Sequence, residues 1–79
     1  MNYTLFNLPL GQNGIIEEIS APFFIKERLH RLGLIRGTLI TPIKTAPLGS
    51  PRIYMYLHTQ IAIRNDLAKK IKIKYVKNH

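Results

Sequence analysis

The chain has 79 residues, no cysteine, and a formal net charge of +8 from 12 lysine and arginine residues against 4 acidic ones. This length predicts a single domain, residues 1–79, with a small core, and the 46% apolar content is typical of a globular fold. Without cysteine there is no disulfide framework and no thiolate metal site. The amino-terminal residues lack the regions of a signal peptide, and no apolar run approaches the roughly 20 residues that span a bilayer. We therefore expect a small soluble domain of the cytoplasm.

The excess of positive charge predicts an anionic partner, which could be nucleic acid, an anionic membrane face or an acidic protein. Surplus lysine that serves only solubility explains the same composition equally well. The charge is concentrated near the carboxyl terminus at five lysines: Lys69, Lys70, Lys72, Lys74 and Lys77.

The first part of the chain predicts a lead-in and one strand. Residues 4–11 place Leu5 and Leu8 over the core. Residues 14–20 form an extended segment in which the adjacent Glu17 and Glu18 interrupt the apolar alternation. Such an interruption favours a bend or bulge at this point of the strand.

Residues 21–32 predict the one helix of the fold. Ser20 is the candidate N-cap, Pro22 is tolerated in the first turn, and Gly33 is the candidate C′ residue that ends the helix. Three apolar residues follow the i, i+4, i+7 spacing of a buried stripe: Ile25, Leu29 and Leu32.

Four further extended segments follow, at residues 38–45, 52–58, 60–64 and 71–76. Pro42 cannot donate a ladder hydrogen bond, so its strand is expected to be an edge or to bulge there. His58 and Thr59 form the turn of a tight hairpin, and Asn65 caps a single helical turn before the last strand.

The alternation in residues 52–58 predicts that Ile53, Met55 and Leu57 point inward. On this interpretation the opposite face carries Arg52, Tyr54, Tyr56 and His58. Aromatic side chains beside a cation could stack nucleic-acid bases, although cross-strand packing or self-association is the favoured explanation.

Together these elements predict a mainly β fold. We expect a small SH3-like barrel of about five strands, with one α-helix inserted after the first strand. Closing the sheet would remove edges that so short a chain could not otherwise cover.

The chain resembles the FeoA family over about residues 3–76. The similar motifs are R-L-G-L at residues 31–34, Gly37, A-P-L-G-S-P at 46–51, I-A-I-R at 61–64 and D-L-A at 66–68. Two positions depart from the family pattern, which usually has aspartate where this chain has Ser50 and proline where it has Arg36.

The resemblance implies an SH3-like barrel without enzymatic activity or cofactor, acting in bacterial ferrous-iron uptake. It implies binding to the cytoplasmic part of FeoB, a membrane protein with a GTPase domain and an iron permease, at the inner face of the plasma membrane. Independently of the resemblance, the short edges of a small barrel would allow a homodimer. A different function stays open, in which a basic module binds nucleic acid or acts as a regulatory domain like that of iron-dependent repressors.

Two segments are candidate partner-binding surfaces. Rigid loops with exposed apolar residues make good anchors, although a plain hairpin connection explains the same residues. The helix could line a groove, although core packing is the simpler explanation. The candidate residues are Phe24, Leu29, Leu32, Pro47, Leu48, Gly49 and Pro51.

No residue pattern indicates catalysis or a specific metal site. The three histidines, His30, His58 and His79, have no ligand spacing, and only His58 and His79 are candidates for adventitious metal binding. There is no P-loop and no activated serine, so we expect no enzyme and no small-molecule substrate.

Overall fold

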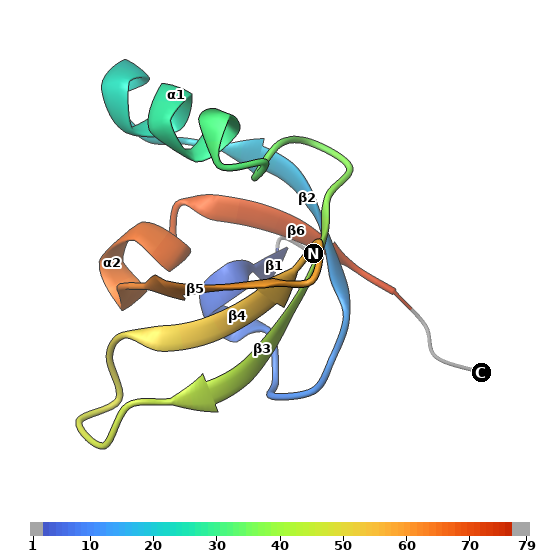
Figure 1. Ribbon diagram of the computed structural model, residues 1–79, viewed down its shortest axis with the longest axis vertical. Coiled ribbons are helices and arrows are strands. Elements are labelled where there is room, and N and C mark those ends of the chain that lie inside the picture. Colours follow the sequence, from blue (N-terminus) through green and yellow to red (C-terminus); the bar gives the residue numbers. More distant parts are fainter. Residues whose placement is uncertain (1–2, 77–79) are drawn as a thin grey trace.

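The computed structural model describes residues 3–76, which form one curved antiparallel sheet, two α-helices and a short 3-10 helix (Figure 1). The strand order is β1-β6-β2-β3-β4-β5. In chain order the elements are β1 (Tyr3–Thr4), the 3-10 helix η1 (Leu5–Asn7), β2 (Gly14–Ile19), α1 (Phe23–Arg31), β3 (Leu39–Thr45), β4 (Arg52–Tyr56), β5 (Thr59–Ile63), α2 (Asn65–Ala68) and β6 (Ile71–Tyr75). The predicted mainly β class is confirmed, with β1 as an additional short strand.

The strand order leaves β1 and β5 hydrogen-bonded on one side only, so the strands do not close into a continuous ring. α1 connects β2 to β3 and lies at one end of the molecule, above α2 and β5 in Figure 1. The core lies within the curve of the sheet and includes residues from η1, α1 and each strand from β2 to β6. Its fully buried members include Leu5, Leu8, Ile16, Leu34, Ile40, Tyr54, Ala68 and Ile71.

Both predicted strand irregularities are confirmed. The register of β2 against β6 shifts between Ile16 and Glu18, and that of β3 against β4 shifts between Pro42 and Lys44. Pro42 is buried, and its carbonyl accepts a hydrogen bond from the Gly11 N–H at 2.8 Å. Proline therefore sits beside a bulge, where a missing ladder donor is tolerated.

The start of α1 differs from the prediction and its end agrees with it. The N-cap is Pro22, without a side-chain hydrogen bond, and the Ser20 N–H instead donates to the Lys70 carbonyl at 2.8 Å. Ser20 therefore belongs to the sheet margin rather than to the helix. At the other end Gly33 has φ +95°, and the Leu34 N–H donates to the Leu29 carbonyl at 2.9 Å. This is the Schellman arrangement that ends a helix at glycine, so the predicted role of Gly33 is confirmed.

The predicted orientation of β4 is wrong. Arg52, Tyr54 and Tyr56 are the buried residues of this strand, with exposed fractions of 8%, 0% and 5%, while Ile53 and Met55 lie at the half-buried face. The inversion also removes the proposed stacking face for nucleic-acid bases, since both tyrosine rings lie in the core.

The hairpin after β4 is confirmed, but its turn lies one residue earlier than predicted. Leu57 and His58 form the turn with φ of 48° and 61°, and Thr59 already pairs with Tyr56. Two successive residues of positive φ are typical of a type I′ turn. Leu57 is consequently 66% exposed rather than inward.

Candidate partner-binding surface

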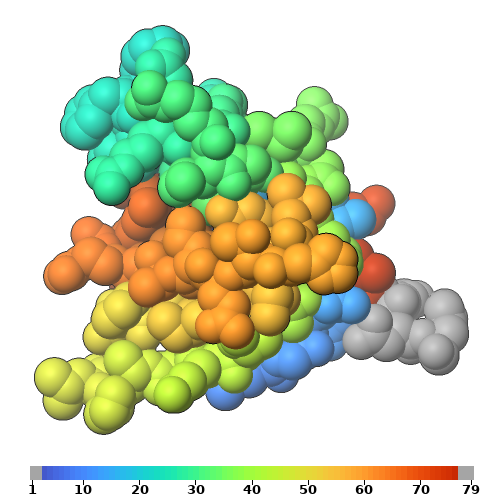
Figure 2. Space-filling view, viewed as in Figure 1, coloured from blue at the N-terminus to red at the C-terminus, as the bar shows by residue number. Residues whose placement is uncertain are grey.

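A groove runs between α1 and the free edge of β5 (Figure 2). It consists of two adjoining hollows of about 460 Å³ and 420 Å³. Both hollows are lined by the same central residues: Ile25, Arg28, Ala62, Ile63 and Leu67. A concave, largely apolar surface of this kind is where a partner or ligand is expected to bind.

The carboxyl-terminal end of α1 is fixed against the β4–β5 hairpin. The Tyr56 hydroxyl donates to the Leu32 carbonyl at 2.9 Å, which occupies one of the carbonyls left free at the helix end. The Leu57 side chain packs over Gly33, where a Cβ would lie 3.2 Å from Leu57 Cδ1. The spacing between the helix and β5 is therefore set by side chains from β4 and the turn.

Positively charged side chains line the hollow that lies beside the amino-terminal end of α1. Arg28, Arg64 and Lys70 line this hollow, together with the single acid Asp66. Asp66 lies 3.8 Å from the Arg64 guanidinium, and both side chains are more than 80% exposed. We call these four charged residues the rim of the groove. The net charge of the rim stays positive after the exposed Arg64–Asp66 ion pair is counted.

The loop at residues 46–51 forms a second exposed feature. Leu48 at its tip is 96% exposed, and Gly49 has φ +89°. Within the loop the Ala46 N–H donates to the Pro51 carbonyl at 3.1 Å, and the Gly49 N–H donates to the Ala46 carbonyl at 2.8 Å. These bonds hold the loop in one shape and present the leucine to solvent.

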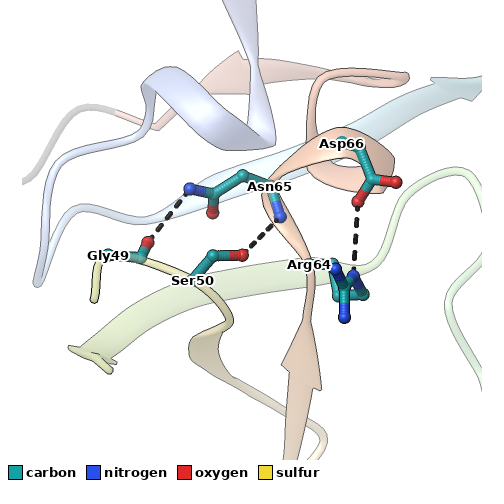
Figure 3. A network of polar contacts seen from close by, with 5 residues as sticks. All are labelled: Gly49, Ser50, Arg64, Asn65 and Asp66. Carbon is teal, nitrogen blue, oxygen red and sulfur yellow. Dashed lines mark hydrogen bonds and ion pairs between the residues drawn. The ribbon is translucent and has the colours of Figure 1, made fainter. Parts of the chain in front are cut away.

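Asn65, at the start of α2, attaches this loop to the body of the protein (Figure 3). Its side-chain amide donates to the Gly49 carbonyl at 3.0 Å, and its backbone N–H donates to the Ser50 hydroxyl at 3.1 Å. The second bond satisfies one of the N–H groups left free at a helix start. Ser50 therefore supplies an acceptor oxygen to the start of α2.

The structure does not bring the candidate residues together on one surface. Leu29 and Leu32 line the groove, where Leu29 is only 5% exposed and Leu32 is 49% exposed. Phe24 is 71% exposed on α1 but is not part of the groove lining. The loop between β3 and β4, which contains Pro47, Leu48, Gly49 and Pro51, lies on the far side of α2 from α1 in Figure 1.

Sequence reasoning missed the β5 side of the groove. Ile61 and Ile63 line the groove floor, and nothing in the local sequence pattern indicates that β5 is an edge strand. The strand order makes β5 an edge, and tertiary packing places α1 beside it. Neither can be read from the local sequence.

The histidines are dispersed. His30 and His58 are exposed on α1 and in the hairpin turn, and His79 lies outside the described residues. Within residues 3–76 no group of three or more His, Asp or Glu side chains is arranged to hold a metal ion. No helix in this part of the chain is long and apolar enough to cross a membrane.

Arg52 and Tyr54 form a buried polar pair beneath the lead-in. The Arg52 guanidinium donates to the Phe6 and Leu8 carbonyls at 3.1 and 2.8 Å and lies 5.5 Å from the centre of the Tyr54 ring. Burial raises the pKa of Tyr54, and the neighbouring Arg52 charge offsets part of that rise. This pair explains the attachment of the lead-in and indicates no catalytic site.

The curved sheet, the single long helix and the groove beside it define a small SH3-like β domain. Residues 3–75 match the FeoA domain. The chain belongs to the FeoA family, a family associated with ferrous-iron transport and not a known enzyme family.

Two solved structures show how far the similarity extends. The solution structure of a FeoA protein from Chlorobium tepidum has a TM-score of 0.90 and 25% identity, covering 95% of this chain and 71% of that one. The crystal structure of FeoA from Stenotrophomonas maltophilia with zinc has a TM-score of 0.79 and 28% identity, covering 91% of this chain and 89% of that one. That protein is described as a prokaryotic SH3 domain protein.

A curated relative joins the same domain to a transporter. The Fe(2+) transport protein A/Fe(2+) transporter FeoB fusion protein of Porphyromonas gingivalis is 24% identical over 75 residues. The match covers 95% of this chain and 9% of the fusion protein, so the chain spans less than a tenth of that relative's length.

Proposed function

We propose that this protein is a non-enzymatic accessory component of ferrous-iron uptake that binds the cytoplasmic part of a FeoB-type transporter. The observation that carries the proposal is the Porphyromonas gingivalis fusion, in which a domain similar to almost the whole of this chain is part of one polypeptide with FeoB. Fusion keeps two domains at high effective concentration, which is useful when the separate domains bind one another.

The groove between α1 and β5 is the surface proposed to bind the transporter. It offers exposed apolar side chains beside a positive rim, and a net charge of +8 favours fast association with an acidic surface of the partner. The Leu48 loop is a second candidate contact, because its tip is exposed and its backbone is held rigidly.

The binding test uses membranes carrying the FeoB-type transporter of the same organism, incubated with the purified protein without nucleotide, with GDP, and with a non-hydrolysable GTP analogue. We expect saturable retention in at least one of these states. Absence of retention in all three would contradict the proposal.

Two leucine variants locate the surface. Leu32 in the groove is 49% exposed and Leu39 on β3, outside the groove lining, is 48% exposed, so the two positions are matched. Leu32→Glu is expected to weaken retention by about tenfold, as for an apolar anchor residue, and Leu39→Glu is expected to leave it unchanged. Equal effects of the two variants would mean that the groove is not the binding surface, and Leu48→Glu then tests the loop.

A further inference from the structure

β5 carries an unpaired row of backbone groups. In an antiparallel pair, residues alternate between exchanging hydrogen bonds and pointing their N–H and C=O groups outward. The type I′ turn makes Tyr56 and Thr59 a hydrogen-bonded pair, so the outward positions on β5 are Gln60 and Ala62. Neither residue has another backbone or side-chain hydrogen bond within residues 3–76.

Although α1 lies beside it across the groove, this edge lacks the other features that usually prevent a sheet from pairing with another chain. Such edges are normally very short, bulged, or protected by lysine or proline. β1, the other edge, has only two residues. β5 has five, with the sequence TQIAI and a regular register to β4. The backbone of β5 could therefore pair with an extended chain that enters the groove between β5 and α1.

The groove provides the side-chain contacts for such an added strand. Its floor beside β5 is formed by Ile61, Ile63 and Leu67, and its opposite wall by Ile25 and Leu29 of α1. In a strand, alternate side chains point to opposite faces, so every second residue of the added segment would face this apolar floor. The intervening residues would face outward, towards solvent and the rim.

The charge of the rim selects the occupant. Arg28, Arg64 and Lys70 surround one end of the groove against the single acid Asp66, which already lies beside Arg64. Pairing of β5 with β5 of a second copy would bring two such rims together between molecules that each carry a net charge of +8. An acidic segment meets the same rim with opposite charge, which favours it over a second copy.

We propose that the free edge of β5 binds an extended acidic peptide segment, with apolar residues at every second position, as an added antiparallel or parallel strand beneath α1. This is recognition by strand addition, in which backbone hydrogen bonds give affinity and alternate pockets give specificity. The inference deepens the proposed function by naming the kind of transporter segment that binds, and it rests on that function only for the identity of the partner.

The first experiment uses a display library of random heptapeptides selected on the purified protein, and so does not depend on any transporter. We expect enriched peptides that alternate apolar residues with aspartate or glutamate. Bound to the protein, they should slow hydrogen exchange at the Gln60 and Ala62 amides by at least about tenfold, because these two N–H groups become paired. Absence of enrichment, or binding without slower exchange at these amides, would overturn the inference.

A matched pair of variants tests the backbone contact. Ala62→Pro removes one outward N–H at an edge position where proline is tolerated, and Ala62→Ser keeps it. We expect Ala62→Pro to weaken peptide binding by about tenfold and Ala62→Ser to have little effect, the loss being that of one backbone hydrogen bond and its geometry. Equal binding by the two folded variants would overturn the inference. The exchange measurement on the unaltered protein decides the question if Ala62→Pro does not fold.

The second experiment separates this inference from the proposed function. Overlapping peptides that span the cytoplasmic part of the FeoB-type transporter replace the library. Library peptides that protect Gln60 and Ala62, combined with transporter peptides that do not bind, would support strand addition and count against the transporter as partner. Slow exchange at the Gln60 and Ala62 amides that appears without peptide and increases with protein concentration would show that β5 pairs with β5 of a second copy. That result would overturn the inference that the edge binds an acidic peptide segment.

Discussion

Arg52 is the one buried positively charged side chain in residues 3–76. It donates hydrogen bonds to backbone carbonyls rather than forming an ion pair with an acidic side chain. Its two hydrogen bonds reach the carbonyls of Phe6 and Leu8, which lie more than 40 positions earlier in the chain. Hydrogen bonds from a charged donor each contribute about 1.5–3 kcal/mol. One side chain therefore holds the lead-in across the sheet, and its charge lies beside Tyr54.

The burial of Tyr54 predicts a loss of stability at alkaline pH. Because the pKa of Tyr54 is raised on folding, the unfolded chain gives up this proton at a lower pH than the native protein. The free energy of unfolding should therefore fall as the pH rises above about 10, by at most about 1.4 kcal/mol per pH unit from this group. Urea denaturation between pH 8 and pH 11 measures the decline.

Tyr54→Phe is the control for this decline. The Tyr54 hydroxyl is buried and has no hydrogen-bond partner within the described part of the chain, so its removal at pH 7 should change stability by less than about 1 kcal/mol. Above pH 10 the variant should lose stability more slowly than the original protein. Identical curves for the two proteins would show that Tyr54 does not control the alkaline transition.

At the scale of elements, the end of α1 and the hairpin turn are parts of one contact. Gly33 has φ +95°, a conformation that costs other residues about 1–2 kcal/mol, and Leu57 packs directly over it. Gly37 has the same φ of +95°, but a Cβ there would meet nothing within 4 Å. The two glycines thus separate backbone strain from side-chain crowding.

Gly33→Ala and Gly37→Ala should both destabilise the protein, by about 1–2 kcal/mol for the backbone alone. Gly33→Ala should cost more, because its Cβ would lie 3.2 Å from Leu57 Cδ1. In a Leu57→Ala background this excess should disappear and the two substitutions should cost the same. Chemical denaturation of the single and double variants measures the free energy of unfolding. If Gly33→Ala still costs more than Gly37→Ala in the Leu57→Ala background, contact with Leu57 is not the cause of the difference.

These elements also show which parts of the fold could be predicted from the sequence. Gly33 and Pro42 act through their own backbone chemistry, so the helix end and the β3 bulge were predictable locally. The orientation of β4 was not, because tyrosine and arginine have apolar bodies that can be buried as readily as Ile53 and Met55 can be exposed. The groove was only half predictable, since α1 supplied a recognisable apolar stripe while the free edge of β5 arises from strand order.

At the scale of the whole molecule, charge repulsion outweighs attraction. The sequence has 12 lysine and arginine residues against 4 acids. The ion pairs found in residues 3–76 are Arg31–Glu27, Arg64–Asp66 and Lys72–Glu18, with distances of 3.8 to 4.0 Å and side chains 41% to 83% exposed. Exposed pairs of this kind stabilise the fold only slightly. Repulsion among the surplus positive charges, which destabilises the fold, is therefore the larger electrostatic effect.

Salt should therefore stabilise this protein. Screening is effective beyond about 10 Å at 0.1 M salt, so repulsion between dispersed cations weakens more than contacts between close ion pairs. We expect unfolding in urea to require about 1 kcal/mol more free energy in 0.5 M than in 0.02 M sodium chloride; chloride is preferred to sulfate, which stabilises proteins by exclusion from their surface. Lys74→Glu, at an exposed position on β6, lowers the net charge by two and should reduce the salt effect. A protein that became less stable with added salt would show instead that its surface ion pairs outweigh the repulsion, and the positive rim of the groove would then be less available to an acidic partner.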